Sequence, residues 1–233
     1  YALKEGFEAL ATGHYCRRVV SVDGRVQLWE GLDKNKDQSY FLSRITQEQL
    51  IHARFPLGGM DKMKVRDLAQ RNDLPVANKK DSQGICFLGK VKVPEFLSNF
   101  IEDQPGEIVT LKGEVVGRHK GLHRYTLGQR RGIGVPSNSD FENYVVTGKD
   151  QSANRLIVAF ENTKESTLWS RTFEISALSF LEEPELSLPL TLLAKPRYRD
   201  SSTPVLLESM NHGNPKINFF DPQRAITPGQ VLA

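Results

Sequence analysis

The sequence has few cysteines: Cys16 and Cys86 are the only two among 233 residues. Two unclustered cysteines do not make a disulfide framework, so we expect a reducing, cytoplasmic compartment. Long apolar runs are also absent, because the longest, such as residues 188–193, are far too short to span a bilayer. The opening residues do not have the pattern of a secretory signal. These absences argue against a disulfide-rich secreted domain and predict no membrane partner.

Charge of one sign is not in excess either. Lys and Arg number 31 against 28 Asp and Glu, which gives a net charge of +3. This balance permits a polyanionic partner without requiring one. The length suits one large domain or two to three small ones. No methionine opens the chain and a strand is predicted to begin at its last residues, so we expect this sequence to be part of a longer protein.

The first residues predict one edge of a parallel α/β sheet. Apolar residues at helical spacing predict a helix over 1–10, and residues 9–12 predict the end of a buried strand. Gly13 and His14 follow directly, which is where ligands bind in such sheets. His14 has two open interpretations, a ligand contact or a loop histidine satisfied by the backbone.

Local signals predict several further elements before residue 80. An Asp-Gly turn predicts a hairpin joining residues 17–22 and 25–32. Thr46 begins a capping box for a helix that extends through His52, and Asp61 caps another helix. A short strand is predicted over 74–77.

The cysteines differ in their surroundings. Cys86 stands between isoleucine and phenylalanine, which is typical of a small buried hydrophobic residue. Against that interpretation, Lys79 and Lys80 could favour a thiolate, and Gly84 allows the backbone to come close to a ligand. Cys16 has no acid or histidine partner placed by the sequence, and we interpret it as incidental.

After residue 93 the sequence is rich in short strands. A helix is predicted over 93–101 and is followed by a small β-rich unit and then a small β-barrel or sandwich. The predicted strands cover 108–110, 115–116, 144–146, 156–158, 172–178, 188–194, 205–208 and 217–220.

Two basic segments are candidates for nucleic-acid contact. The loop at 119–134 contains Arg130 and Arg131 beside glycine and tyrosine, which suits phosphate contact. Its histidines lack the intervening glutamate and helical context of a zinc protease, so no metal site is predicted. At 197–199 two arginines flank Tyr198, and such a group can grip phosphates and stack on exposed bases. A charged edge strand that discourages aggregation is the open alternative there.

Six motifs together carry a family resemblance. They are Ala-Thr-Gly-His-Tyr at 11–15, Lys-Asp-Gln-Ser-Tyr-Phe at 36–41, Lys-Asp-Ser-Gln-Gly-Ile-Cys-Phe at 80–87, Tyr-Thr-Leu-Gly-Gln-Arg at 125–130, Arg-Tyr-Arg at 197–199 and Thr-Pro-Gly-Gln at 227–230. In this order and spacing the chain resembles the tRNA-specific 2-thiouridylases, which place sulfur on the wobble uridine (position 34) of certain tRNAs.

The resemblance implies a fold of the class α/β plus β. Residues 1–92 would be the C-terminal part of a PP-loop ATPase-like nucleotide-binding domain, 93–164 a central β-rich domain, and 165–233 a truncated C-terminal β-barrel. The glycine-rich loop that grips ATP and the family's first catalytic cysteine would lie in sequence not present here. We therefore expect this chain alone to be inactive.

The resemblance also implies a mechanism. ATP with Mg²⁺ adenylates the C2 oxygen of the uridine, and sulfur then arrives as a persulfide on Cys86. The first catalytic cysteine would form a disulfide with Cys86 as the sulfur is transferred. A sulfur-donor protein, either a cysteine desulfurase or a sulfur relay protein, would load the persulfide.

Roles for individual residues follow from the same resemblance. Gly13 corresponds to a nucleotide contact. The residues that correspond to tRNA contacts are His14, Lys36, Asp37, Gln38, Arg197, Tyr198 and Gln230. Phosphate contact by Arg130 and Arg131 is suggested by the residues themselves and not by the resemblance.

Two alternatives stay open at this point. The chain could be a tRNA-binding module without chemistry, since it carries basic loops but no ATP loop. A tRNA methyltransferase is the weaker alternative, because no clear glycine-rich loop follows a strand to hold a methyl donor.

Overall fold

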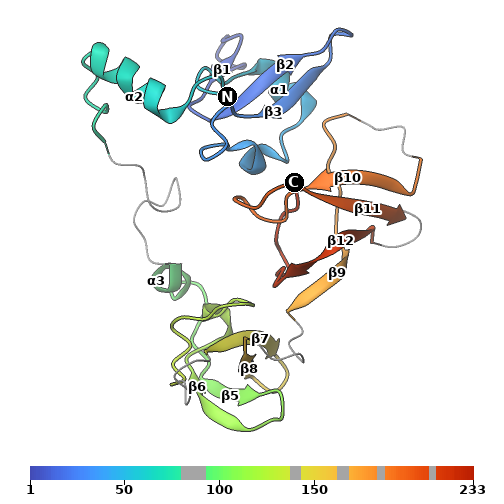
Figure 1. The fold of residues 1–233 in the computed structure, drawn as a ribbon. Coiled ribbons are helices and arrows are strands. Elements are labelled where there is room, and N and C mark those ends of the chain that lie inside the picture. Colours follow the sequence, from blue (N-terminus) through green and yellow to red (C-terminus); the bar gives the residue numbers. More distant parts are fainter. Residues whose placement is uncertain (80–92, 137–142, 162–167, 183–186, 210–213) are drawn as a thin grey trace. The chain divides into compact units, whose positions relative to one another are not determined.

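The computed structural model describes residues 1–79, 93–136, 143–161, 168–182, 187–209 and 214–233 (Figure 1). The chain divides into two compact units. The first comprises Tyr1–Lys80, Glu174–Asn218 and Val231–Ala233, and the second comprises Asp81–Phe173 and Phe219–Gln230. In the described ranges, none of the helices has the length and hydrophobicity needed to cross a membrane.

The predicted hairpin of the first unit is confirmed. Strands β2 (Cys16–Val20) and β3 (Val26–Glu30) pair antiparallel, with Cys16 opposite Glu30. The turn between them depends on Gly24, whose φ of 84° is a conformation that residues with a side chain rarely adopt. This hairpin fixes where the polar loop after Glu30 begins.

The predicted sheet edge is confirmed in part. Strands β1 (Leu10–Ala11) and β4 (Ala53–Arg54) pair in parallel, as expected for an α/β sheet. The expected burial is wrong, because both residues of β1 are exposed. The predicted helix over 1–10 is also wrong: residues 2–6 form turns, and Gly6 adopts a φ of 85°. So short a segment needs tertiary packing to be helical, and its apolar residues Leu3 and Phe7 are exposed.

The two capped helices form where the capping residues stand. Thr46 makes the complete capping box of α1 (Gln47–His52). Asp61 accepts a hydrogen bond from the Lys64 amide and begins α2 (Lys62–Arg71). The strand predicted over 74–77 is wrong. Residues 75–77 form a turn, and the amides of Leu74 and Ala77 donate to the carbonyls of Ala69 and Leu74 instead of to a neighbouring strand.

The later strands form an open sheet. It consists of β9 (Trp169–Glu174), β10 (Leu190–Ala194), β11 (Thr203–Ser209) and β12 (Lys216–Arg224), in the order β10-β11-β12-β9. The strand predictions are confirmed with shifted bounds, and β9 ends at Glu174 instead of residue 178. Among the described residues β10 and β9 each have one neighbour, so the expected barrel is not closed there.

The second unit contains the β-rich element that the sequence predicts. Its sheet has the order β6-β5-β8-β7 and consists of β5 (Gly106–Thr110), β6 (Val115–His119), β7 (Tyr144–Asp150) and β8 (Arg155–Phe160). Strands β5 and β8 pair in parallel and the other neighbours antiparallel. The core is formed by Ile108, Tyr125, Ile133, Val146, Leu156 and Val158. The preceding helix α3 (Val93–Leu97) is shorter than predicted, since residues 98–100 form turns.

Candidate functional site

A polar pocket of about 430 Å³ lies in the first unit. It is formed by the loop that follows β3 and the segment that follows β10. The residues that line it are Lys34, Asn35, Lys36, Asp37, Lys195, Tyr198, Arg199 and Asp200. Three residues predicted to contact tRNA, Lys36, Asp37 and Tyr198, are thus brought together from distant parts of the sequence.

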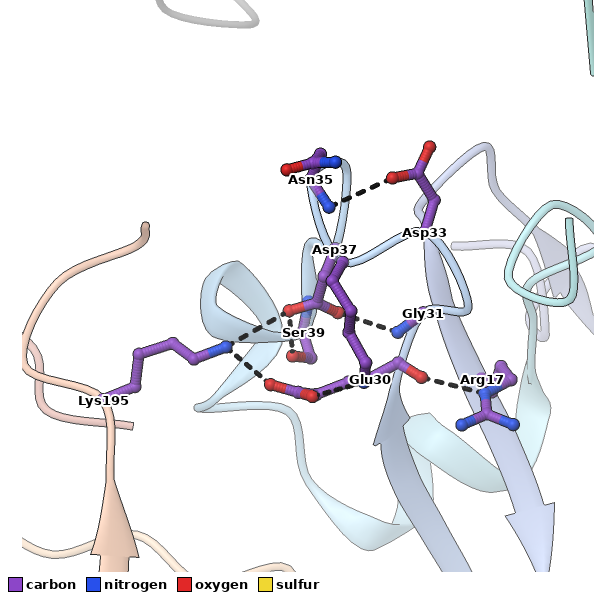
Figure 2. A network of polar contacts seen from close by, with 9 residues as sticks. Arg17, Glu30, Gly31, Asp33, Asn35, Asp37, Ser39 and Lys195 are labelled. Atoms are coloured by element: carbon purple, nitrogen blue, oxygen red, sulfur yellow. Dashed lines mark hydrogen bonds and ion pairs between the residues drawn. The ribbon is translucent and has the colours of Figure 1, made fainter. Parts of the chain in front are cut away.

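Asp37 organises the loop on one side of this pocket. Its side chain is only 5% exposed. One carboxylate oxygen accepts hydrogen bonds from the amides of Gly31 at 2.9 Å and Ser39 at 3.2 Å, and the other accepts from the Ser39 hydroxyl at 2.8 Å (Figure 2). Gly31 is required here, because a Cβ would lie 2.6 Å from the Tyr15 carbonyl oxygen. The carboxylate therefore holds the loop in shape, and its predicted contact with tRNA stays a prediction.

Lys195 connects this loop to the end of β10. Its Nζ lies 2.6 Å from Glu30 Oε1 and 3.6 Å from Asp37 Oδ2 (Figure 2). Burial opposes the charged form of Lys195, but the hydrogen bond and charge of Glu30 outweigh it and raise the pKa of Lys195. Hydrogen bonds from Lys195 and then Lys34 lower the pKa of Glu30 to about 2. Both groups are therefore ionised at neutral pH.

Gln38 is also held by the protein. Its side-chain oxygen accepts a hydrogen bond from the Tyr15 backbone amide at 3.0 Å, and the Gln38 backbone amide donates to the Tyr15 carbonyl at 2.9 Å. The loop is further tied down by Asp33, which accepts from the amides of Asn35 and Lys62. Residues 36–38, which are predicted to contact tRNA, therefore belong to a loop held by hydrogen bonds, and Lys36 lines the pocket.

Aromatic side chains lie beside the pocket. The rings of Phe41 and Tyr198 are 4.4 Å apart, and Tyr40 lies 6.2 Å from Tyr198. Tyr40 is buried, whereas Phe41 is 58% exposed. Arg197 pairs with Asp200 at 3.4 Å. Sequence reasoning assigned roles to Arg197 and Tyr198 but none to Phe41, although Phe41 ends one of the six motifs.

Gly13 and His14 are not among the residues that line this pocket. They follow β1, where the Thr12 amide donates to the Arg54 carbonyl. His14 Nδ1 lies 2.8 Å from the Thr12 hydroxyl, and the His14 ring meets the edge of Phe55. A Cβ at Gly13 would meet only Leu57, at an ordinary 3.8 Å. A side chain at Gly13 would therefore meet no steric conflict among the described residues.

Only one of the two cysteines lies among the described residues. Cys86, the predicted catalytic residue, lies outside the described residues. Cys16 is fully buried, and burial followed by the charge of Asp37 raises the pKa of its thiol to about 12. A thiol with such a pKa is protonated and unreactive at neutral pH, which agrees with its interpretation as incidental.

In the second unit, the 125–130 motif forms a packed corner. Tyr125 belongs to the core, and Gly128 has a φ of 79°. A Cβ at Gly128 would lie only 2.8 Å from the Ala225 Cβ, which is too close. Arg130 pairs with Glu161 at 2.9 Å, and Arg224 pairs with the other oxygen of the same carboxylate at 3.0 Å. A phosphate that bound Arg130 would compete with Glu161.

The phosphate contact predicted for Arg131 and the tRNA contact predicted for Gln230 stay predictions as well. Arg131 is exposed and forms no ion pair with any described residue. Gln230 is an exposed residue of the second unit, and its amide donates to the Thr227 carbonyl.

Comparison with known proteins covers nearly the whole chain. Residues 1–90 match the family model described as a tRNA methyl transferase HUP domain, 94–160 the tRNA methyl transferase PRC-barrel domain, and 170–233 the aminomethyltransferase beta-barrel domain. The tRNA-specific 2-thiouridylase MnmA of Akkermansia muciniphila is 44% identical over 233 residues, which is 100% of this chain and 64% of that protein. The MnmA of Pseudomonas fluorescens is 46% identical over 234 residues, 100% of this chain and 61% of that protein.

The chain belongs to the tRNA-specific 2-thiouridylase family. It spans 61 to 64% of the length of these relatives. Membership in the family accounts for the six motifs and places the pocket in the part of the chain matched by the HUP and beta-barrel models. The predicted borders after residues 92 and 164 stay predictions.

Proposed function

We propose that the full-length protein is a tRNA-uridine 2-sulfurtransferase, to which this chain contributes a tRNA-binding surface and the sulfur-carrying Cys86. The observation that carries the proposal is the pocket of the first unit. Three residues expected to contact tRNA line it together with the cations Lys34 and Arg199. Cations beside an aromatic ring suit an RNA strand, whose phosphates take the charges while a base stacks on the ring. The relatives that match the whole chain are named for tRNA 2-thiolation.

In the proposed reaction Cys86 carries sulfur to the activated C2 of the uridine. ATP, bound with Mg²⁺ in the full-length protein, would transfer AMP to the C2 oxygen of the wobble uridine with release of pyrophosphate, which makes that oxygen a leaving group. The terminal sulfur of a Cys86 persulfide attacks C2, and AMP departs with the oxygen. A second cysteine thiolate then attacks Cys86 Sγ, which leaves sulfur on C2 and a disulfide between the cysteines. A cysteine desulfurase or a sulfur relay protein would supply the persulfide.

Gly13 would meet the nucleotide. It follows β1 at the carboxyl end of the parallel β1–β4 pair, where ligands bind in α/β sheets. His14 follows it and would lie beside the tRNA.

The test uses the two cysteines as a matched pair in the full-length protein. Cys86→Ser should abolish 2-thiouridine in tRNA, measured by mass spectrometry of digested nucleosides. Cys16→Ala should retain it, since the buried thiol has no proposed role. Normal thiolation by Cys86→Ser would overturn the assignment. The same spectra record methylated nucleosides, and new methylation without thiolation would favour the methyltransferase alternative.

The second candidate, a tRNA-binding module without chemistry, is favoured by the basic pocket alone. Filter binding of tRNA to this chain across a salt series tests it, because phosphate contacts make affinity fall steeply with salt. Salt-dependent binding by this chain, together with thiolation by the full-length protein, would support both proposals at once. Binding without thiolation by the full-length protein would favour the module.

A further inference from the structure

Two segments of the first unit form the pocket, and one side chain bridges them through ionic contacts. Residues 34–38 follow β3, and residues 195–200 follow β10. Lys195 spans 165 positions of sequence to reach Glu30, and it also approaches Asp37 (Figure 2). A contact between such distant positions is a tertiary restraint, since nothing local holds the two segments together.

The surroundings of Lys195 differ from those of Lys34, another cation that lines the pocket. Its side chain is only 15% exposed, whereas that of Lys34 is 64% exposed. Two carboxylates, those of Glu30 and Asp37, face its ammonium group. A phosphate that approached Lys195 would be repelled by both carboxylates, so this ammonium is a poor direct contact for RNA.

A second contact joins the 195–200 segment to the residues just after the loop. Phe41, just beyond the loop, lies 4.4 Å from Tyr198, and the buried Tyr40 lies 6.2 Å from it. Pro196, between Lys195 and Arg197, is fully buried. The ion pair therefore fixes one end of the 195–200 segment, and the aromatic contact fixes its middle.

We propose that Lys195 is a positioning residue for RNA binding, which holds Lys36 and Tyr198 in one surface by bridging Glu30 and Asp37. The inference rests on the proposed function, because it assumes that this surface binds tRNA. Lys195 acts through the loop and the 195–200 segment and does not itself touch the RNA. Glu30 shares the role, although an acid near a polyanion would otherwise weaken binding.

The first experiment measures binding of an unmodified tRNA transcript with a wobble uridine to the full-length protein over a salt series. Lys195→Met should weaken binding about tenfold, the size expected when a coupled position is disturbed. It should leave the slope of log affinity against log salt unchanged. Lys36→Met, by contrast, should reduce that slope by about 0.7 to 0.9 if Lys36 contacts one phosphate. Lys195→Arg, which keeps the charge, should restore most of the affinity.

The second experiment uses the sign of an effect. Removing a negative charge near RNA strengthens binding if electrostatics alone decides. Glu30→Gln should instead weaken binding, because Lys195 loses its closest partner. Asp67→Asn is the matched control, since Asp67 pairs with Arg71 on α2 and does not line the pocket. It should leave affinity unchanged or slightly higher.

Each outcome decides the inference. Wild-type affinity in both Lys195→Met and Glu30→Gln would overturn it, and so would a slope change in Lys195→Met equal to that of Lys36→Met. Far-UV circular dichroism and thermal melting check folding, and Glu30→Gln together with Lys195→Arg keeps the test valid if Lys195→Met unfolds. Failure of the wild-type protein to bind or thiolate tRNA would instead reject the proposed function, so the two failures are distinguishable.

Discussion

The motif at 36–41 in the first unit and the motif at 125–130 in the second both match the family, yet different forces hold them. Polar contacts shape the first, in which the Asp37 carboxylate accepts hydrogen bonds from two amides and a hydroxyl and lies close to the ammonium group of Lys195. Packing shapes the second, in which Tyr125 is part of the core and Gly128 lies against Ala225. A motif typical of a family can thus mark a corner of the fold as well as a ligand contact.

The largest loss of stability is expected from a substitution in the core beside the 125–130 motif. Leu156 is fully buried among Ile108, Tyr125 and Val158. Leu156→Ala should lower the free energy of unfolding by about 3 kcal/mol, because it removes apolar contacts and leaves a cavity. Chemical denaturation followed by fluorescence measures the loss. A loss below about 1 kcal/mol would mean that this core can collapse around the smaller side chain.

The next largest effect is expected at the corner itself. Gly128→Ala should cost about 2 kcal/mol, since alanine is strained at a φ of 79° and its Cβ would lie 2.8 Å from the Ala225 Cβ. Gly113→Ala is the control, because it has a similar φ of 84° with nothing within 4 Å of the added Cβ. The difference between the two thermal midpoints isolates the cost of packing. Equal midpoints would show that backbone strain alone matters.

In the first unit, removing a charge should lower the free energy of unfolding less than the substitutions in the second unit do, and it should weaken tRNA binding more. Asp37→Asn keeps the size of the side chain but weakens its hydrogen bonds and its attraction to Lys195. We expect a loss of about 1 to 2 kcal/mol in the free energy of unfolding, together with weaker tRNA binding. Denaturation and filter binding of the same preparation measure both. Unchanged binding despite lost stability would mean that the loop shape does not control the pocket.

The smallest effect is a dependence on pH. The pKa of Glu30 is lowered from 4.5 to about 2 in the folded protein. Its contribution to stability is therefore complete above about pH 4.5 and is lost as the pH falls toward 2. Because its side chain is 39% exposed, solvent screening keeps this contribution below about 1 kcal/mol. The stability difference between the wild type and Glu30→Gln should shrink between pH 5 and pH 3, and a difference that grows there would contradict the assigned ion pair.

Local chemistry made much of the fold predictable. The Asp-Gly turn at Gly24 and the caps at Thr46 and Asp61 each act within a few residues, and all three formed as expected. The segment at 1–10 was predicted wrongly for the opposite reason. Its helical spacing has meaning only if a neighbouring surface covers the apolar residues, and those residues are exposed.

The candidate site was predictable only in pieces. Motifs named Lys36, Asp37 and Tyr198, but no local pattern tells that Lys195 pairs with Glu30, because the two are 165 positions apart. The partner of Arg130 was hidden in the same way, since Glu161 lies 31 positions further along the chain. Ion pairs between distant residues depend on the completed fold, so sequence reasoning found the cations and missed what neutralises them.

The burial of Cys16 has a practical consequence for labelling. A thiol that is shielded from solvent and protonated at neutral pH does not react with maleimides or iodoacetamide while the protein is folded. The chain has only one other cysteine. Any thiol label taken up by the native chain would therefore report on Cys86 alone, because Cys16 would not compete for the reagent.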